Sequence, residues 1–299
     1  GMVICELIER GIVNAIVSTG ALMAHGLVEA TGKSHFRYNP EVSDEDLYEQ
    51  GYNRVYDTLE PETNLDHVEE VMAEVLNAWD HNEVMCSYKL NHKIGQFLAT
   101  HSKNERGILK SAYQKGVPVF VPAFTDSEMG LDVALNNRLR ESTGRYRFHF
   151  DPFEDLEHFA ATLLRQKRLG IFTIGGGVPR NWSQQFGPFL ELRHRRLGEN
   201  IPLKRYHYGV RICPEPVHWG GLSGSPYSEA ISWGKFVPPA EGGRFGELFV
   251  DATVGLPLIV AAVLERLDKS NPEKPKLDKS TAGSTGKVTK TKGKPGRKK

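Results

Sequence analysis

The sequence LGIFTIGGG at residues 169–177 decides the fold. Its first six residues, 169–174, are mostly apolar and rich in β-formers, which predicts a buried strand. Gly175, Gly176 and Gly177 follow at once, and glycines let a backbone approach a flat ligand closely. In α/β proteins, ligands bind in the crevice beyond the carboxyl ends of parallel strands. We therefore predict a ligand-binding edge here, with a mobile turn as the alternative.

Short apolar segments alternate with amphipathic segments along the rest of the chain. Further strands are predicted at residues 14–17, 117–122, 148–150, 204–213 and 247–251. Helices are predicted at residues 2–10, 64–79, 88–102, 152–168 and 256–266. This alternation predicts an α/β fold with a doubly wound, mainly parallel sheet. Residues 39–62 contain several acids and are predicted to be mostly loop.

The composition is that of a protein with a substantial core and a basic tail. The chain has 299 residues, of which 39% are hydrophobic. Residues 269–299 hold eleven Lys or Arg and two acids, whereas residues 1–268 hold 27 basic and 35 acidic residues. We predict one large domain over residues 1–268 and a disordered tail over residues 269–299. The tail is predicted to aid solubility; contact with nucleic-acid phosphates is the alternative.

The cysteines indicate a reducing compartment. Cys5, Cys86 and Cys213 are scattered and form no CxxC pair, which favours the cytosol and predicts no metal site. The chain has no apolar run of 18 residues and no charged-then-apolar leader. Neither a membrane span nor secretion is therefore predicted.

The chemistry is predicted to centre on SPYSEAISWGK at residues 225–235. A short helix places Glu229 and Trp233 on one face, and Gly234 ends it. The break lets Lys235 turn into the same pocket, where the indole supplies a dry wall and a cation-π surface. A lysine is a nucleophile only as the neutral amine, and burial lowers its pKa toward that form. The alternative is a solvated lysine after a helix end.

A second candidate ligand site follows the predicted strand at residues 14–17. Ser18, Thr19, Gly20 and Ala21 form a turn of small residues, and a helical pattern starts just after it. A strand, a tight turn and a helix together present backbone N–H groups to phosphate. The stretch lacks the GxGxxG spacing, so a simple packing turn is an equal alternative.

Five stretches in this order resemble the deoxyhypusine synthase family. They are GYNRV at 51–55, PVF with PAFTD at 118–126, GGGV at 175–178, EAISWGK at 229–235 and VDA at 250–252. The resemblance extends over residues 3–266. In that family, the lysine that matches Lys235 forms a covalent imine with an aminobutyl group. The resemblance implies a Rossmann-like fold that binds NAD, in a homotetramer whose NAD sites are shared across subunit interfaces.

The resemblance also implies roles for individual residues. The implied NAD contacts are Ser18, Thr19, Gly20, Ala21, Asp126, Gly175, Gly176, Ser223, Asp251 and Ala252. The implied amine contacts are Glu229, Trp233, Asp132, Glu128, Asn181 and Gly220. Read without the resemblance, Asp126 is a helix N-cap. An acid that ends a strand, as Asp251 does, suits a ribose or adenine contact.

Several positions depart from the family pattern. Ala24 and His25 stand where two glutamates are expected, Asn181 replaces a histidine, Trp219 and Leu222 replace aspartates, and Leu131 aligns with the amine-binding aspartate. Glu128 or Asp132 would then substitute for that aspartate. Because a charged contact contributes about 1.5–3 kcal/mol, the losses predict a pocket for a different or shorter amine. His25, read alone, is more often a structural histidine than a catalyst.

The predicted function is NAD-dependent transfer of an aminobutyl group from a spermidine-like polyamine through a lysine-bound imine. The acceptor is predicted to be a lysine of a translation factor precursor, as in deoxyhypusine synthesis. The alternative acceptor is a free diamine such as putrescine, as in homospermidine synthesis. A third hypothesis is a catalytically silent nucleotide-binding or assembly protein. Relatives have additional N-terminal residues, including a segment that contacts the nucleotide.

Overall fold

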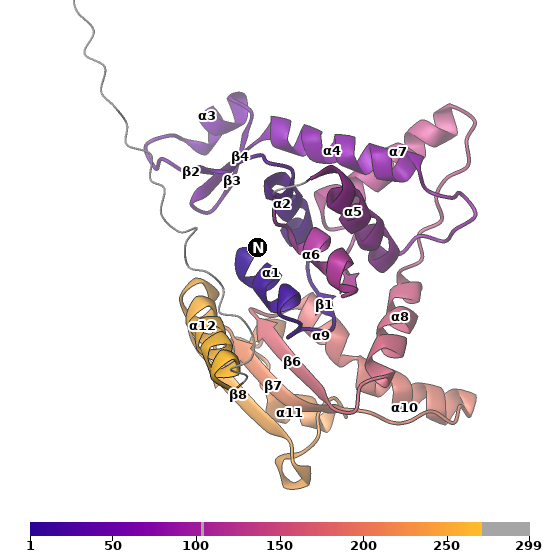
Figure 1. Cartoon of the computed structure of the whole chain (residues 1–299), viewed down its shortest axis with the longest axis vertical. Helices are drawn as coiled ribbons and strands as arrows, with labels where there is room; N and C mark the ends of the chain where they lie inside the picture. The colour runs from indigo at the N-terminus through magenta and orange to yellow at the C-terminus, as the bar shows by residue number, and fades with distance from the viewer. Residues whose placement is uncertain (103–104, 271–299) are drawn as a thin grey trace, which may run out of the picture. The chain divides into compact units, whose positions relative to one another are not determined.

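A computed structural model describes residues 1–102 and 105–270 of the chain (Figure 1). The helices are α1 (Met2–Glu9), α2 (Gly20–Ala30), α3 (Asp44–Glu49), α4 (Glu62–Asn77), α5 (Ser87–His101), α6 (Ile108–Lys115), α7 (Glu128–Ser142), α8 (Pro152–Leu164), α9 (Val178–Gln184), α10 (Phe186–Leu197), α11 (Tyr227–Ser232) and α12 (Ala252–Ser270). The strands are β1 (Ile16–Val17), β2 (Phe36–Arg37), β3 (Tyr52–Val55), β4 (Thr58–Pro61), β5 (Val119–Phe120), β6 (Leu169–Ile174), β7 (Tyr206–Ile212) and β8 (Arg244–Leu248).

The strand predicted at residues 169–174 is confirmed as β6, the first strand of a parallel sheet in the order β6-β7-β8. The prediction that this strand is buried is wrong, because Phe172 and Ile174 are 36% and 37% exposed. The register pairs Ile174 with Ile212 and Ile212 with Leu248, so all three strands end at one edge. Backbone hydrogen bonds continue just past it, from Gly175 N to Ile212 O over 2.7 Å and from Cys213 N to Leu248 O over 3.0 Å. The glycine turn therefore starts at a defined sheet edge.

A second, two-stranded parallel sheet pairs β1 with β5. Val17 lies opposite Phe120, and Ser18 N donates to Phe120 O over 2.9 Å. The turn after β1 and the turn after β5 consequently leave the sheet side by side. Both sheets place turns at the carboxyl ends of parallel strands, which confirms the α/β class.

Two hydrophobic cores stabilise these elements. One lies among α1, α2 and α4–α7, the helices that gather around the N-terminal half of the chain in Figure 1. Its fully buried members include Met23, Met72 and Leu90. The other core lies around the β6-β7-β8 sheet and includes Phe186 and Phe236. Phe120 of β5 belongs to this second core, so the two parallel sheets share packing.

Residues 39–62 are more regular than predicted. They contain α3 and the hairpin β3–β4, and β4 is the central strand of an antiparallel sheet in the order β2-β4-β3. The hairpin turn includes Tyr56 at φ 55°, a conformation usually given to Gly, Asn or Asp. Because the strands are short and the position with positive φ is Tyr56, not Gly, Asn or Asp, the usual hairpin signal is missing from the sequence.

Three other boundaries differ from prediction. Residues 148–150 form only an isolated bridge, from Met85 to Phe150. The last strand is shifted: β8 runs from Arg244 to Leu248 because its register is set by β7, so Asp251 lies beyond the strand. Asp126 does not cap α7, since the side chain of Ser127 accepts the hydrogen bond from Gly130 N over 3.2 Å.

The chain divides into two compact units, Gly1–Val260 and Ala261–Lys299. Only residues 261–270 of the second unit are described, and they form the C-terminal part of α12. The tail predicted from residue 269 lies outside the described residues except for its first two positions, and it remains a prediction.

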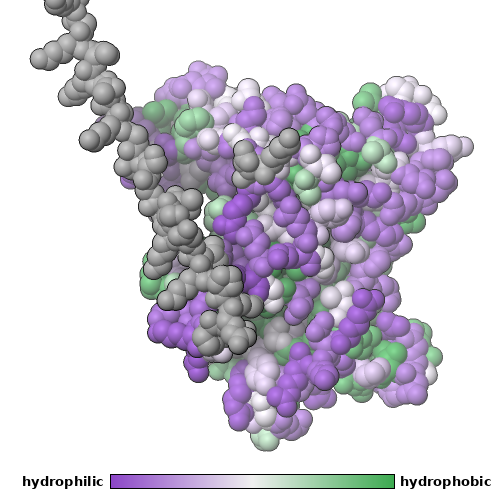
Figure 2. Space-filling view, viewed as in Figure 1, coloured by the Kyte–Doolittle hydropathy of each residue, from purple (hydrophilic) through white to green (hydrophobic). Residues whose placement is uncertain are grey.

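Among the described residues, no helix combines the length and apolar character needed to cross a membrane. Figure 2 shows mainly hydrophilic residues on the face in view, with hydrophobic ones scattered among them.

Candidate functional site

The backbone around Lys235 is fixed by a helix end and by a strand. After α11, Gly234 adopts the left-handed conformation at φ 69°, and Lys235 N donates to Ala230 O over 3.2 Å. This is the usual way in which a glycine terminates a helix. Lys235 O then accepts a hydrogen bond from Tyr206 N, the first residue of β7, over 3.0 Å. The predicted helix break at Gly234 is confirmed, and it turns Lys235 back toward the sheet.

The side chain of Lys235 is buried, with 8% of its surface exposed. Its Nζ donates a hydrogen bond to Asn181 Oδ1 over 2.8 Å. Asn181 lies on α9, which begins directly after Gly175, Gly176 and Gly177. The structure therefore brings the predicted nucleophile to the helix that follows the glycine turn.

Burial lowers the pKa of Lys235 below its ordinary value, and the nearby Arg180 guanidinium lowers it further. The Glu229 carboxylate acts in the opposite direction. Desolvation is the largest of these effects, so the net change is toward the neutral amine. This is the protonation state that a lysine nucleophile requires.

Trp233 and Glu229 border the lysine without enclosing it. Lys235 Nζ lies 5.9 Å from the centre of the Trp233 ring, within cation-π range. The indole is nevertheless 64% exposed, because Trp233 is the C-cap residue of α11 and lies outside the core. The dry indole wall predicted from the sequence is therefore absent from the described single chain. Glu229 is exposed on the same helix.

Two buried arginines hold the loop that precedes α11. Arg180 donates to Ser225 O over 2.6 Å, and Arg211 donates to Ser223 O over 2.6 Å. Arg211 also donates to Glu247 Oε2 over 2.6 Å and has 1% of its side chain exposed. Sequence reasoning missed Arg180, Arg211 and Glu247. The available signal was an arginine inside an apolar strand, at position 211, with an acid in the next strand.

The glycine turn lies directly against this loop. A Cβ on Gly176 would come within 2.6 Å of Ser223 Cα, so only glycine fits there without displacing the loop. Gly175 and Gly177 have φ angles of 75° and 100°. Gly220, at φ 72°, ends the short 3-10 helix Val217–Trp219 in the same loop. The structure thus unites four predicted ligand contacts, Gly175, Gly176, Gly220 and Ser223.

The small-residue turn after β1 is a helix N-terminus. Thr19 caps α2 by accepting a hydrogen bond from Leu22 N over 3.3 Å, and Ala21 lies in the first turn. Gly20 packs so closely on Ser127 that a Cβ would overlap its side chain. The turn of residues 18–21 therefore adjoins exposed Asp126, the residue before Ser127.

Asp251 and Ala252 begin α12. Asp251 Oδ1 accepts hydrogen bonds from Thr253 N over 2.8 Å and from Thr253 Oγ1 over 2.6 Å. These bonds lower the pKa of the Asp251 carboxyl below its ordinary value. An exposed carboxylate that remains charged at the carboxyl end of β8 has the chemistry expected of a ribose or adenine contact.

Glu128 and Asp132 belong to a separate group of acids. They lie four residues apart on α7, and Glu69 on α4 acts on Asp132. Burial and the charges of Glu69 and Glu128 raise the pKa of Asp132 to about 6. Glu128 Oε2 is buried and lacks a hydrogen-bond partner. In the part of the chain that the structure describes, no hydrogen bond or ion pair joins this group to Lys235 or its neighbours.

Comparisons with known proteins agree with the motif pattern. A family model described as deoxyhypusine synthase matches residues 1–263. A probable deoxyhypusine synthase 2 of Methanosarcina acetivorans is 32% identical over 265 residues, which are 88% of this chain and 72% of that protein. A deoxyhypusine synthase-like protein of Chlorobaculum parvum is 30% identical over 275 residues, 91% of this chain and 75% of that protein.

A comparison with solved structures finds a similar fold. A crystal structure of a putative deoxyhypusine synthase from Entamoeba histolytica superposes with a TM-score of 0.53 at 15% identity, covering 86% of this chain and 68% of that one. At this identity, the likeness concerns the fold.

Proposed function

Because this chain belongs to the deoxyhypusine synthase family, we propose that it transfers an aminobutyl group from a spermidine-like polyamine to an acceptor amine, through an imine on Lys235. The observation that carries the proposal is the environment of Lys235. Its side chain is buried, its pKa is lowered, and its Nζ donates a hydrogen bond to Asn181. Burial opposes the charge of a lysine and so shifts Lys235 toward the neutral, nucleophilic amine.

The proposed cofactor is NAD, and the residues present fit it. Gly176 makes a close backbone approach to Ser223, the N-terminus of α2 offers amides at Gly20 and Ala21, and Asp251 supplies a charged carboxylate. Ser18, Thr19, Asp126, Gly175 and Ala252 complete the proposed set. A doubly wound, Rossmann-like arrangement of the parallel sheets would present these turns at one edge. Bound NAD would supply hydride removal from the carbon beside an amine nitrogen.

The chain's own residues then perform the transfer. Lys235 Nζ, as the neutral amine, adds to the electrophilic carbon, and the smaller amine leaves with the nitrogen's electron pair and a proton. Asn181 orients Nζ with an oxygen that adds no charge. The acceptor amine adds to the same carbon, and Lys235 leaves with the electron pair of its C–N bond and a proton; bound reduced cofactor would supply the hydride for the product. Covalent capture divides one difficult substitution into two easier ones.

The polyamine is proposed to lie between the lysine and acidic side chains. Trp233, Glu229 and Gly220 lie on the lysine side, and Glu128 and Asp132 are the candidate carboxylates for a distal ammonium group. The unpaired Glu128 Oε2 supports this, because a buried carboxylate oxygen without a partner requires a ligand or water. The family's homotetramer, with sites shared between subunits, would join the two groups. The buried free cysteines suit a cytosolic setting.

A trapping experiment tests the proposal. The purified chain is incubated with NAD and labelled spermidine or putrescine, reduced with borohydride, and the adduct is mapped by mass spectrometry. We expect label on Lys235 and none in Lys235→Arg, because a guanidinium does not deprotonate to attack. Lys110→Arg is the control. Lys110 is as buried as Lys235, but its Nζ donates to nearby backbone carbonyls and has no contact with Asn181 among the described hydrogen bonds. Label on another lysine would contradict the assignment, and absence of any adduct would favour a catalytically silent protein.

The acceptor separates two versions of the activity. Transfer to a lysine of a translation factor precursor would be deoxyhypusine synthesis, and transfer to putrescine would be homospermidine synthesis. The departures Ala24, His25, Asn181, Trp219 and Leu222 change the charge and size of the amine pocket and leave both acceptors open. Supplying each acceptor in the trapping assay, and identifying the product, decides between them.

A further inference from the structure

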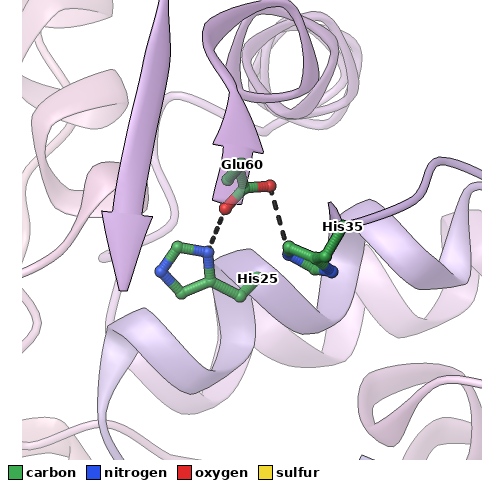
Figure 3. Close-up of side chains that lie close together, drawn as sticks. All are labelled: His25, His35 and Glu60. Carbon is green, nitrogen blue, oxygen red and sulfur yellow. Dashed lines mark hydrogen bonds and ion pairs between the residues drawn. The ribbon is translucent and has the colours of Figure 1, made fainter. Parts of the chain in front are cut away.

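A cluster of two histidines and a glutamate contains none of the site residues described above, although the charge of Glu128 acts on His25. His25 is on α2, His35 immediately precedes β2, and Glu60 is on β4. Figure 3 shows Glu60 between the two imidazoles, with one carboxylate oxygen directed at each ring. One donor atom from each of the three side chains lies within 4.8 Å of the others. The three residues thus converge on one point from separate elements.

Glu60 is buried, and only one of its two carboxylate oxygens has a hydrogen-bond partner. Glu60 has 1% of its surface exposed, and its Oε2 is hydrogen-bonded to His25 Nδ1. Its Oε1 lies 3.3 Å from His35 Nε2 and has no hydrogen-bond partner. Leaving a buried carboxylate oxygen unpaired is costly, so its position calls for a ligand. The histidine side chains are 29% and 18% exposed, which leaves the cluster accessible to a small ion.

Glu29 adds a second carboxylate on the far side of His35. Its Oε1 lies 3.5 Å from His35 Nδ1, so each ring nitrogen of His35 faces a carboxylate. A neutral imidazole has one N–H and cannot donate to both. A metal-binding histidine has this arrangement, with one nitrogen on the ion and the other donating to an outer carboxylate.

We propose that His25 Nδ1, His35 Nε2 and the Glu60 carboxylate bind one divalent transition metal ion, with zinc as the best fit, and that Glu29 positions His35. Two imidazole nitrogens and one carboxylate oxygen form a set that zinc binds in protein sites, with the fourth position left to water. An ammonium group could also contact these three side chains, so the test below includes spermidine as a competing ligand. The site goes beyond the proposed transferase activity and does not depend on it.

A comparison within the chain supports the choice of cluster. Cys86, Glu154 and His158 also lie within metal-binding distance of one another. However, Glu154 is engaged by Lys89, and burial together with Asp155 raises the pKa of Cys86 to about 12. A thiol that holds its proton is a poor ligand. The sequence predicted no metal site because it was judged from the cysteines, and the positions 25, 35 and 60 follow no motif spacing.

Zinc titration of the full, tag-free chain tests the proposal. After dialysis against a chelator, binding is measured by competition with a chromophoric chelator, and bound metal is counted by elemental analysis. We expect one zinc ion per chain. Glu60→Gln and His35→Ala should weaken binding by more than about 100-fold, and Glu29→Gln by about 10- to 100-fold. The control is His67→Ala, because His67 pairs with Glu70 on α4 but belongs to no group of three potential metal ligands among the described residues; the zinc affinity of this variant should be unchanged.

Several outcomes would overturn the site. They are less than half an equivalent of zinc on the wild-type chain, unchanged affinity in Glu60→Gln, or an equal loss in His67→Ala. Spermidine binding that depends on Glu60 without any zinc binding would identify an ammonium site and would also overturn it. If Glu60→Gln and His35→Ala fail to fold, as judged by circular dichroism, Glu29→Gln decides, because Glu29 is exposed and its replacement leaves the core intact.

Discussion

Lys235 Nζ donates a hydrogen bond to Asn181 Oδ1 over 2.8 Å, although the residues lie on different elements and far apart in the chain. The chemistry of the accepting group, the Asn181 amide, determines its effect on Lys235. An amide oxygen accepts from an ammonium or from a neutral amine and carries no net charge, so it orients Nζ without holding its proton. Burial and Arg180 then lower the pKa of Lys235, with only Glu229 opposing them. The contact and the pKa shift together support a nucleophilic lysine.

The first prediction exchanges that amide for a carboxylate. In Asn181→Asp, a negative charge within hydrogen-bond distance of Nζ should raise the pKa of Lys235 by about 1–3 units. Since only the neutral amine attacks, the pH profile of borohydride-trapped adduct should move to higher pH, with little adduct left at pH 7. Asn181→Ala is the control. It removes the orienting contact without adding charge, so the rate should fall while the pH midpoint stays near that of the wild type. Equal midpoints in all three proteins would contradict this explanation.

The second prediction concerns the helix end at Gly234. Its φ of 69° costs a residue with a Cβ about 1–2 kcal/mol, although the nearest atom to a new Cβ is Glu191 Oε2 at 3.5 Å, which is ordinary contact. Gly234→Ala should lower the free energy of unfolding in urea by that amount, and Gly234→Asn by less. Gly26→Ala is the matched control, because Gly26 lies within α2 and a Cβ there meets open space. It should be neutral or stabilising by up to about 1 kcal/mol. A similar loss in both alanine variants would show that backbone strain is not the cause.

The local features of the site could be predicted from the sequence. The helix break at Gly234 and the strand ending in Gly175 follow from residues that are neighbours in the chain. The motif order also predicted the family correctly. The same reasoning placed Asn181 in the amine pocket only through the resemblance, since its contact with Lys235 depends on how α9 packs against the end of α11.

Contacts between residues far apart in the chain, and the exposure of individual side chains, could not be predicted. Arg211 and Glu247 pair across β7 and β8, and only the register of the sheet brings them together. The exposure of Trp233 was predicted wrongly, because periodicity gives the face of a helix but not what covers that face. The cluster at His25 was missed because Glu60 lies on a strand within a segment that was predicted to be loop.

The third prediction uses the acids of α7. The pKa of Asp132 is raised from 3.8 to about 6, so the folded chain binds a proton more tightly than the unfolded chain does. Stability contributed by the protonated group is present below pH 3.8 and is lost as pH rises to about 6. At pH 7.5, Asp132→Asn should therefore be more stable than the wild type by up to about 3 kcal/mol, and the difference should vanish near pH 3.5. Urea unfolding of the wild type and of Asp132→Asn across this pH range measures the difference in stability.

Asp66→Asn on α4 is the control for the acid cluster, because Asp66 is exposed. This variant keeps Asp132, so its unfolding free energy should follow that of the wild type at each pH. If Asp132 also holds a substrate ammonium, Asp132→Asn should weaken spermidine binding while it stabilises the chain. A stabilised variant with unchanged spermidine affinity would remove Asp132 from the proposed amine site.

The fourth prediction tests the buried pair behind the lysine loop. Arg211→Met leaves Glu247 without its partner and frees the carbonyls of Ser223 and Ser225, so it should cost about 3–5 kcal/mol. Adding Glu247→Gln removes the unpaired charge and keeps an acceptor for Tyr227 N, so the double variant should be more stable than Arg211→Met alone. By contrast, Arg193→Met, in the more exposed pair with Glu199, should cost less than about 1 kcal/mol. Urea denaturation of the wild type, Arg211→Met, Glu247→Gln and the double variant gives the coupling energy between the two residues. A double variant no more stable than Arg211→Met would mean that Arg211 acts through the loop carbonyls rather than through Glu247, and the trapping yield on Lys235 should then fall equally in both.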